Sequence, residues 1–444
     1  MYQTTTIILK NKDYELKEFF KNQCELAKLF KNTVIFRCRQ LLFAKDNDYT
    51  NLQQHTLDVL DEFKLTEDKY KQINNKYYLP GYNHFDYMFK VTNNVDYYNE
   101  LPMQSTQQII KECLDDFKSY FKAMKEYNKN PSKFTGKPKL PKYIKNDKIS
   151  FTVTNQDSYI KNGYLKLPKI KTRLFVDDIC KGKLIELIIK PYYDTFKLCI
   201  TFEDNKDYNK QLDTTRILGL DLGINNFITT SNNCGLNPFI INGKIMKSYN
   251  QWYNKELARL KSLLLSNKRH NLYTSNKLNH INKKRQNYFN DKIHKISSYI
   301  INYCISNNIG TIVVGKTEGW KTKINIGKSN NQNFTQIPHA KFIDKLEEKA
   351  TKFGITVIIQ EESYTSKCSF LDNDFIYTYD VDDNEPKYSG KRIYRGLYKT
   401  KNNIIINADV NGASNIIKKA IPDAFFGITN YDYLTKTVEK INII

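Results

Sequence analysis

This sequence of 444 residues has few of the residues that usually build metal centres and disulfide frameworks. Its 6 histidines show no ligand spacing, and its 8 cysteines include no CxxC pair. Scattered thiols of this kind are typical of a reduced, intracellular protein. The composition therefore argues against a histidine-built metal centre and against a secreted, disulfide-rich domain.

Long hydrophobic runs are also missing. No apolar stretch approaches the roughly 20 residues of a membrane-spanning helix. The first residues, MYQTTTIILKNKD, lack the basic flank and the long apolar core of a signal peptide. We therefore predict no membrane partner and an intracellular location, in the cytoplasm or nucleoid of a prokaryote with an AT-rich genome.

Positive charge and aromatic rings are abundant instead. Lys and Arg number 69 against 47 Asp and Glu, so the formal net charge is +22 and the pI is near 9.3. Such a charge is typical of polyanion binders, and the 32 Tyr and 25 Phe can stack on bases. Anionic membranes also attract basic proteins, and an AT-rich genome enriches Lys and Tyr without any function, so composition alone leaves the partner open.

The first half of the chain has the pattern of a small β-barrel with a helical insertion. Alternating apolar and polar residues predict strands, and apolar residues three and four positions apart predict helices. The predicted strands are 3–10, 149–154, 164–169 and a hairpin over 184–203, and the predicted helices are 16–44 and 101–127. We assign residues 1–12 and 128–211 to the barrel and residues 13–127 to the helical insertion.

Residues 212–444 have the pattern of an RNase H-like α/β layer. Predicted helices at 247–266, 277–307 and 338–354 alternate with strands near 217–220, 311–315 and 355–360. The fold class is therefore α/β and β.

Two acids stand where a two-metal nuclease needs them. Asp221 ends the apolar run of RILGLDLGINNF, and Asp409 opens a helix-like segment in ADVNGASNII. Carboxylates on regular elements can hold the paired ions that clamp the oxygens of a phosphodiester. The alternative is that Asp221 is a turn residue and Asp409 a helix cap.

The segments GLDLGINNF, ITVIIQEESYTSKCSF and ADVNGASNII, together with GKPKLPKY, resemble the TnpB (OrfB) family of transposon-encoded nucleases. These proteins are related to type V CRISPR effectors and to the eukaryotic Fanzor proteins. The resemblance implies a RuvC-type nuclease domain, a wedge barrel and a recognition insertion. It also implies a guide RNA, a DNA target met as double and single strands, and two Mg²⁺ ions, which Mn²⁺ could replace. A Fanzor-like protein would be nuclear.

The second acid departs from the family pattern. Gly315 occupies the strand end where relatives usually carry a glutamate. Glu362, three residues before Thr365-Ser366-Lys367, is our first choice for a relocated acid, since some relatives carry an acid there. Glu361 and Glu318 are the alternatives, and a site without a second acid is another. The predicted metal ligands are thus Asp221, Glu362 and Asp409.

The zinc ribbon that the family usually carries is also degenerate here. Its interval, 364–406, keeps only Cys368, so we predict no structural zinc. We expect this segment to remain a lid over the site, held by the packing of Tyr377, Tyr379, Tyr388 and Tyr394.

Basic residues in three regions are candidates for nucleic-acid contacts, with a solvated charged surface as the alternative. They are Lys137, Lys139, Lys142, Arg259, Arg269, Lys283, Lys284, Arg285, Lys367 and Arg392.

Three functions fit the sequence. The first is an RNA-guided, Mg²⁺-dependent DNA endonuclease that cuts beside a short adjacent motif. The second is a guided DNA-binding repressor without nuclease activity, for which Gly315 argues. The third is a strand-transfer transposase that uses the same acids without a guide. The sequence leaves monomer and dimer undecided.

Overall fold

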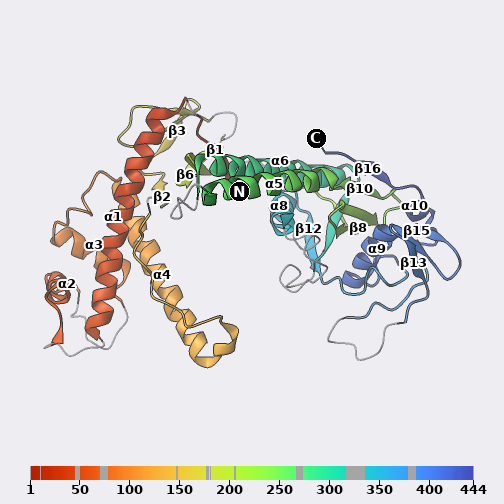
Figure 1. Ribbon diagram of the computed structural model, residues 1–444, viewed down its shortest axis with the longest axis horizontal. Coiled ribbons are helices and arrows are strands. Elements are labelled where there is room, and N and C mark those ends of the chain that lie inside the picture. Colours follow the sequence, from red (N-terminus) through yellow and green to blue (C-terminus); the bar gives the residue numbers. More distant parts are fainter. Residues whose placement is uncertain are drawn as a thin grey trace. The chain divides into compact units, whose positions relative to one another are not determined.

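The computed structural model describes residues 2–10, 12–45, 51–70, 79–146, 149–176, 180, 182–204, 207–266, 274–316, 336–378 and 387–443. The chain forms two compact units, Met1–Lys206 and Asp207–Ile444 (Figure 1). In the described ranges, no helix has both the length and the hydrophobicity that crossing a membrane requires.

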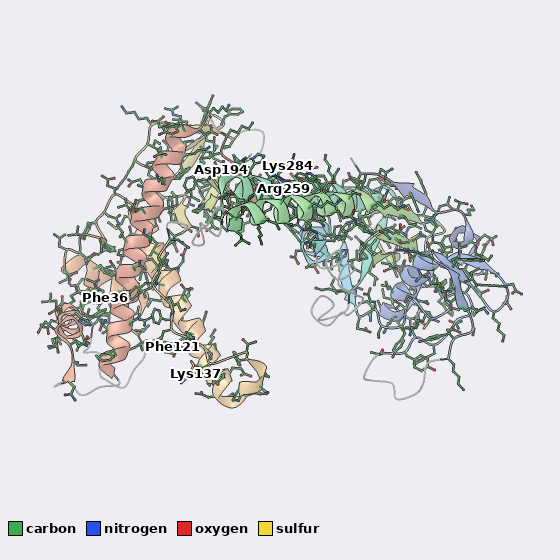
Figure 2. All side chains as sticks on the ribbon, in the orientation of Figure 1. Phe36, Phe121, Lys137, Asp194, Arg259 and Lys284 are labelled. Carbon is green, nitrogen blue, oxygen red and sulfur yellow. The ribbon has the colours of Figure 1, made fainter. Side chains whose placement is uncertain are left out.

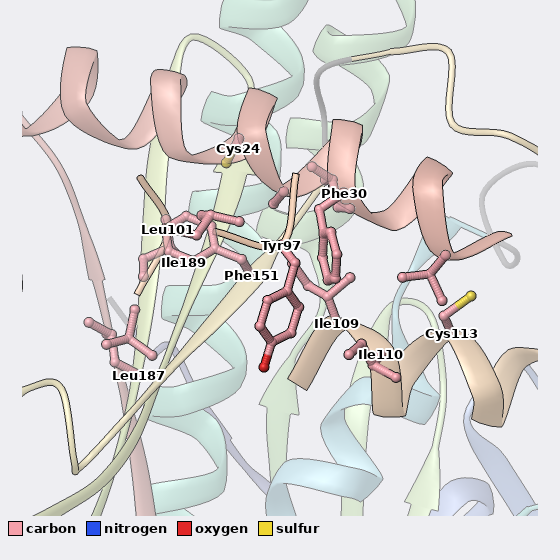
Figure 3. Packing of buried hydrophobic residues seen from close by; sticks show 14 of the residues in the cluster. Cys24, Phe30, Tyr97, Leu101, Ile109, Ile110, Cys113, Phe151, Leu187 and Ile189 are labelled. Carbon is pink, nitrogen blue, oxygen red and sulfur yellow. The ribbon is translucent and has the colours of Figure 1, made fainter. Parts of the chain in front are cut away.

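Four helices of the first unit occupy the predicted insertion, including two in the region where the sequence pattern was weak. They are α1 (Tyr14–Lys45), α2 (Gln54–Lys64), α3 (Tyr82–Val91) and α4 (Met103–Lys129). Residues Ile110, Leu114 and Phe117 recur on one face of α4 and are buried in the core that α4 shares with α1. Figure 3 shows this core around Tyr97 and Phe30.

The strands of the first unit form two sheets, which strand pairing does not join into one barrel in the described residues. The first sheet has the order β1-β7-β6-β2 and the second the order β3-β4-β5. Their bounds are β1 Tyr2–Ile8, β2 Phe151–Thr154, β3 Tyr159–Lys161, β4 Tyr164–Lys166, β5 Leu174–Phe175, β6 Lys183–Tyr192 and β7 Thr195–Glu203.

A six-stranded sheet of order β12-β11-β8-β9-β10-β16 organises the second unit. Strand β8 runs antiparallel to β9 and parallel to β11, which in turn is parallel to β12. The bounds are β8 Asp213–Leu222, β9 Asn226–Asn232, β10 Phe239–Asn242, β11 Ile309–Gly315, β12 Thr356–Gln360 and β16 Glu439–Ile441.

Helices pack on this sheet and extend from it. Helices α6 and α8 pack on one face of the sheet, and with its side chains they form the main core of the second unit. Helix α9 packs on the opposite face of β8 and β11. Helix α5 runs alongside α6 (Figure 1). The bounds are α5 Lys244–Ser266, α6 Asn276–Ser306, α8 His339–Lys352, α9 Ala408–Ala420 and α10 Asp432–Thr435.

A small antiparallel sheet precedes α9 in the chain. It consists of β13 (Lys391–Tyr394), β14 (Leu397–Lys399) and β15 (Ile405–Asn407), in that order. Because β15 leads directly into α9, this sheet lies next to the beginning of that helix.

Candidate functional site

Strand β8 brings Asp221 to the face of the sheet that α9 covers. Because side chains alternate along a strand, Ile217, Gly219 and Asp221 share one face, and Leu218 and Leu220 point into the main core on the other. A Cβ atom on Gly219 would lie 2.5 Å from Ile417 Cγ1 of α9. The glycine therefore allows α9 to lie close against the strand that carries Asp221.

The ends of β8, β11 and β12 lie at one edge of the sheet. Leu220 pairs with Val314, and Gly315 pairs with Gln360. The carboxyl ends of parallel strands meet at the same edge, which is where sites of α/β sheets usually form. Asp221, Gly315 and the residues just after Gln360 are therefore neighbours.

Helix α9 begins with its own cap and presents Asp409 in its first turn. The Asn407 side chain accepts hydrogen bonds from the backbone N–H groups of Asp409, at 2.9 Å, and Val410, at 3.2 Å. The carboxylate of Asp409 is held on both sides. Asn226 Nδ2 donates to Asp409 Oδ2 at 2.7 Å, and Arg392 Nη2 lies 3.2 Å from Asp409 Oδ1.

A carboxylate oxygen of Glu362 occupies the space that a side chain at position 315 would enter. A Cβ atom on Gly315 would lie 2.6 Å from Glu362 Oε2 and 2.6 Å from Ile416 Cδ1. A side chain at position 315 and the present position of Glu362 are thus incompatible without movement. Glu362 follows β12, the strand that pairs with β11.

The neighbouring Glu361 is engaged elsewhere. Lys419 Nζ donates to its carboxylate at 2.7 Å, and Ser363 donates through its backbone N–H at 2.6 Å and its hydroxyl at 2.8 Å. Burial would raise the pKa of Glu361, but these hydrogen bonds lower it below its usual value. Glu361 therefore forms a structural ion pair with Lys419. Glu318, the third alternative, lies outside the described residues.

Electrostatics couple the three acids. Burial raises the pKa of Asp221 well above its usual value, and the nearby charges of Glu362 and Asp409 raise it further, while Arg392 acts in the opposite direction. In the part of the chain that the structure describes, no three His, Cys, Asp or Glu side chains already stand close enough to hold a metal ion. The three carboxylates therefore share one environment but are not gathered around a common point.

A basic cleft opens beside Asp221 and Asp409. Its volume is about 810 Å³, and Asn225, Asn226 and Thr229 are among its polar lining residues. Five cationic side chains also line it, namely Lys244, Lys247, Arg392, Arg395 and Lys440. Such a concentration of positive charge around two carboxylates suits a polyanion that must approach acidic groups.

The predicted contacts of the basic connector lie on the surface. Lys137, Lys139 and Lys142 are exposed, and Figure 2 marks Lys137. Lys367, in the loop after β12, is exposed as well. Arg269 lies outside the described residues.

The candidates on α5 and α6 are partly engaged with neighbours. Arg259 makes a two-pronged ion pair with Glu256 at 2.6 and 2.9 Å. Lys284 lies 5.4 Å from the centre of the Trp252 ring, and Lys283 is half-buried on the same helix. Figure 2 shows Arg259 and Lys284 on these two helices.

Arg285 is bound within the protein. Its guanidinium donates to Asn250 Oδ1 at 2.8 Å and to the Gln336 carbonyl at 2.9 Å, and it lies over the rings of Tyr253 and Phe289. These contacts give Arg285 a structural role between α5, α6 and the start of α8, in addition to the predicted contact with nucleic acid.

The segment of the degenerate zinc ribbon is held by a buried carboxylate. Asp374 accepts hydrogen bonds from the backbone N–H of Ser369, at 2.8 Å, and from Ser389 N and Oγ, at 3.0 and 2.5 Å. The predicted packing of Tyr394 is wrong, because this side chain is 74% exposed on the small sheet.

Two of the other tyrosines predicted for the lid, Tyr377 and Tyr388, differ from Tyr394. Tyr377 contacts the rings of Tyr364 and Phe375, the Tyr388 hydroxyl is buried, and Tyr379 lies outside the described residues. Tyr398, which the sequence did not single out, is 1% exposed and donates to the Lys367 carbonyl at 2.7 Å.

Several residues at the site escaped the sequence analysis. Asn226 holds Asp409, and Lys247 and Lys440 line the cleft. The buried Asn411 and Asn415 bind the loop after β12. The one signal for the last two was a pair of asparagines four residues apart in ADVNGASNII, which places them on one side of a helix.

Two family models match parts of the chain between residues 197 and 416. Residues 197–321 match a model described as a probable transposase, OrfB_IS605, and residues 339–416 match a Cas12f1-like TNB domain. The first segment contains Asp221, and the second contains Glu362 and Asp409. No curated protein matches the chain.

Solved structures are similar over nearly the whole chain. A Cas12f1–sgRNA–target DNA complex has a TM-score of 0.50 and 16% identity, covering 92% of this chain and 86% of the other. The mini-RNA-guided endonuclease CRISPR-Cas_phi3 has a TM-score of 0.43 and 11% identity, covering 99% and 94%. At this identity the first similarity concerns the fold alone, and it confirms the predicted mixed α/β content.

Proposed function

Because the resemblance to the TnpB-like compact nucleases is confirmed by two family models, we propose that this protein is an RNA-guided, Mg²⁺-dependent DNA endonuclease. Its second unit would be a RuvC-like nuclease domain, and the sheets of its first unit would form the wedge that carries a helical recognition insertion. Guide pairing would select the sequence, and the protein would read a short motif beside the target. The complex of similar fold contains guide RNA and target DNA, which supports these partners.

The donor set fits Mg²⁺, since three carboxylates supply the oxygen ligands that this hard cation prefers. Asp221, Glu362 and Asp409 would hold the ions, and these would stabilise charge on the attacking and leaving oxygens of the phosphodiester. The raised pKa of Asp221 supports this assignment, because a cation would offset the burial that chiefly raises it and the repulsion from Glu362 and Asp409 that adds to it.

Other side chains would bind and orient the substrate. Lys244, Lys247 and Arg395 line the cleft and would hold the phosphates of a single strand. Asn226 fixes one oxygen of Asp409 and so orients the carboxylate. Arg392, 3.2 Å from the other oxygen, would be available to bind the phosphate if Asp409 held a cation.

One observation carries the proposal, namely that Glu362 fills the place above Gly315. The position that lacks the family's acid is occupied by a carboxylate from the next strand, 2.6 Å from where a Cβ atom of residue 315 would be. An acid is therefore supplied to the same edge of the sheet by a different residue, which favours an active nuclease over the repressor.

The test is cleavage of a labelled duplex by protein co-expressed with its flanking genomic RNA, in Mg²⁺. At saturating Mg²⁺, we expect matched targets to be cut by the wild type and by Glu361→Gln, but not by Asp221→Ala or Glu362→Gln. Guided binding without cutting by the wild type would overturn the nuclease and leave the repressor. Cutting or joining of transposon ends by RNA-free protein would favour the transposase.

A further inference from the structure

Helix α9 binds the segment that carries Glu362. Four of its side chains, at positions 411, 415, 418 and 419, donate hydrogen bonds to residues 361–377. We call these four residues the α9 clasp: Asn411, Asn415, Lys418 and Lys419. The same helix carries Asp409 and packs on β8, which carries Asp221, so one helix touches all three acid-bearing regions.

The two asparagines hold the turn that follows Glu362. Asn411 Nδ2 donates to the Cys368 carbonyl at 2.7 Å, and Asn411 Oδ1 accepts from Phe370 N at 2.9 Å. Asn415 Nδ2 donates to the carbonyls of Thr365 and Cys368, both at 2.8 Å. Both asparagines are 0% exposed. Buried amides are costly unless paired, so these bonds are strong constraints on the loop.

The turn passes this constraint to Glu362. Thr365 donates to the Glu362 carbonyl through its hydroxyl at 2.8 Å and its backbone N–H at 3.3 Å, and the Thr365 carbonyl accepts from Asn415. Tyr364 between them has φ +63°, a left-handed conformation that a bulky residue adopts only when its surroundings enforce it. Thr365 thus links Glu362 to Asn415 through two consecutive hydrogen bonds.

The lysines of the clasp bind residues before and after Glu362 in the same segment. Lys419 Nζ donates to the Glu361 carboxylate at 2.7 Å and to the Ser363 carbonyl at 3.1 Å, on either side of Glu362. Lys418 Nζ donates to the Asp374 carbonyl at 3.0 Å, further along the segment.

We propose that Asn411 and Asn415 are positioning residues for the metal-dependent cut, because they set the place of Glu362 relative to Asp409. This inference rests on the proposed function. Glu362 lies beyond the end of β12, where the paired strand has stopped, and β12 is an edge strand. Contacts other than the sheet therefore help to place it, and the clasp provides such contacts to the turn that follows it. A loosened clasp would leave the fold and DNA binding in place but weaken the binding of metal.

The experiment compares Asn411→Leu, Asn415→Leu and the milder Thr365→Val with the wild type, each as its guide RNA complex. Asn232→Leu is the matched control. Asn232 is also 0% exposed and bonds the backbone of its own turn at Cys234 and Leu236, at the end of β9 away from Asn226. Three quantities are measured: Mn²⁺ affinity without DNA by electron paramagnetic resonance, guided DNA binding, and cutting as a function of Mg²⁺ concentration.

We expect the clasp variants to bind Mn²⁺ about tenfold more weakly and to need correspondingly more Mg²⁺, as when residues behind metal ligands are changed. Their DNA affinity should match that of the wild type. Asn232→Leu should lower the melting temperature without changing either metal dependence. Equal metal dependence in the clasp variants and the wild type, or an equal shift in Asn232→Leu, would overturn the inference. A wild type that neither binds Mn²⁺ nor cuts would instead overturn the proposed function.

Discussion

Asp221 and Glu362 reach the same edge of the sheet in different ways. Asp221 stands on β8, a central strand paired on both sides, with α9 on one face and the main core on the other. Glu362 follows β12, an edge strand, and depends on a turn that α9 holds through side chains. The first acid is placed by the backbone ladder and the second by a few hydrogen bonds.

An acid can thus be held in place by backbone pairing within a sheet or by side-chain hydrogen bonds to a loop. A side chain on a central strand moves only if the sheet is disturbed, whereas one on a held loop moves if a few polar contacts are lost. Substitutions that remove a few local contacts should therefore displace the side chain of Glu362 more readily than that of Asp221. The predictions below, from the largest expected effect to the smallest, test this asymmetry.

Removing the charge of either acid should abolish cutting. We expect Asp221→Asn and Glu362→Gln each to slow cleavage by about 10³-fold or more, the scale on which removing a key charge-stabilising group acts. Single-turnover assays at saturating Mg²⁺ measure this. A Glu362→Gln protein that still cuts at a tenth of the wild-type rate would mean that the loop does not supply the second acid.

The same Asp221→Asn variant should be more stable than the wild type without metal. The folded pKa of Asp221 is raised, so its charged form costs stability once the pH rises through that value. The gain should therefore appear at neutral pH and disappear in acid, where the wild-type carboxyl is protonated in both states. Thermal melting at both pH values, in the presence of a chelator, measures it.

Position 315 should couple to Glu362. Gly315→Ala places a Cβ atom 2.6 Å from the Glu362 carboxylate and should destabilise the fold by about 1–3 kcal/mol through overpacking. In a Glu362→Gly background the cost should fall by about 1 kcal/mol, as expected for residues in contact. Urea unfolding of the four proteins in this cycle measures the coupling. Strictly additive effects would contradict the contact.

The lid should depend on Asp374 and not on zinc. Asp374→Ala removes the acceptor for Ser369 and Ser389 and should cost about 1.5–3 kcal/mol locally, whereas Asp374→Asn should cost less. Hydrogen exchange should rise in residues 364–406 and remain unchanged in β8. A zinc chelator should leave both regions as they are. One tightly bound zinc per chain by metal analysis would refute this.

The smallest effect concerns the basic cleft beside Asp221 and Asp409. Lys244→Gln and Lys247→Gln should each reduce the slope of log affinity against log salt by about 1 for single-stranded DNA. Lys255→Gln, an exposed lysine of the same helix outside the cleft, is the control. Equal changes in all three would mean that the cleft has no special part in binding.

The sequence predicted the position of Asp221, on its central strand, more completely than that of Glu362, in its loop. The apolar run before Asp221 and the cap-like start of ADVNGASNII reflect local patterns, which the structure repeats in β8 and α9. Glu361 and Glu362 were left open because adjacent residues at a strand end point in different directions. Tertiary contacts distinguish them, since Glu361 pairs with Lys419 whereas Glu362 lies beside Gly315 and raises the pKa of Asp221.

Long-range contacts account for what the sequence could not show. Asn415 bonds residues about 50 positions away, and Lys440 lines the cleft because β16 pairs with β10 across 200 positions. Arg285 resembles its basic neighbours in sequence, but the packing of α5 on α6 turns it inward. No local pattern carries such information.

The contact between Glu362 and the space above Gly315 also restricts evolutionary routes. In the present backbone, a Cβ atom at 315 would lie 2.6 Å from Glu362 Oε2 and 2.6 Å from Ile416 Cδ1, so both side chains would have to move aside to admit it. The effect of a substitution at 315 therefore depends on the residue at 362, and the reverse is also true. Such dependence is epistasis between the ends of two neighbouring strands.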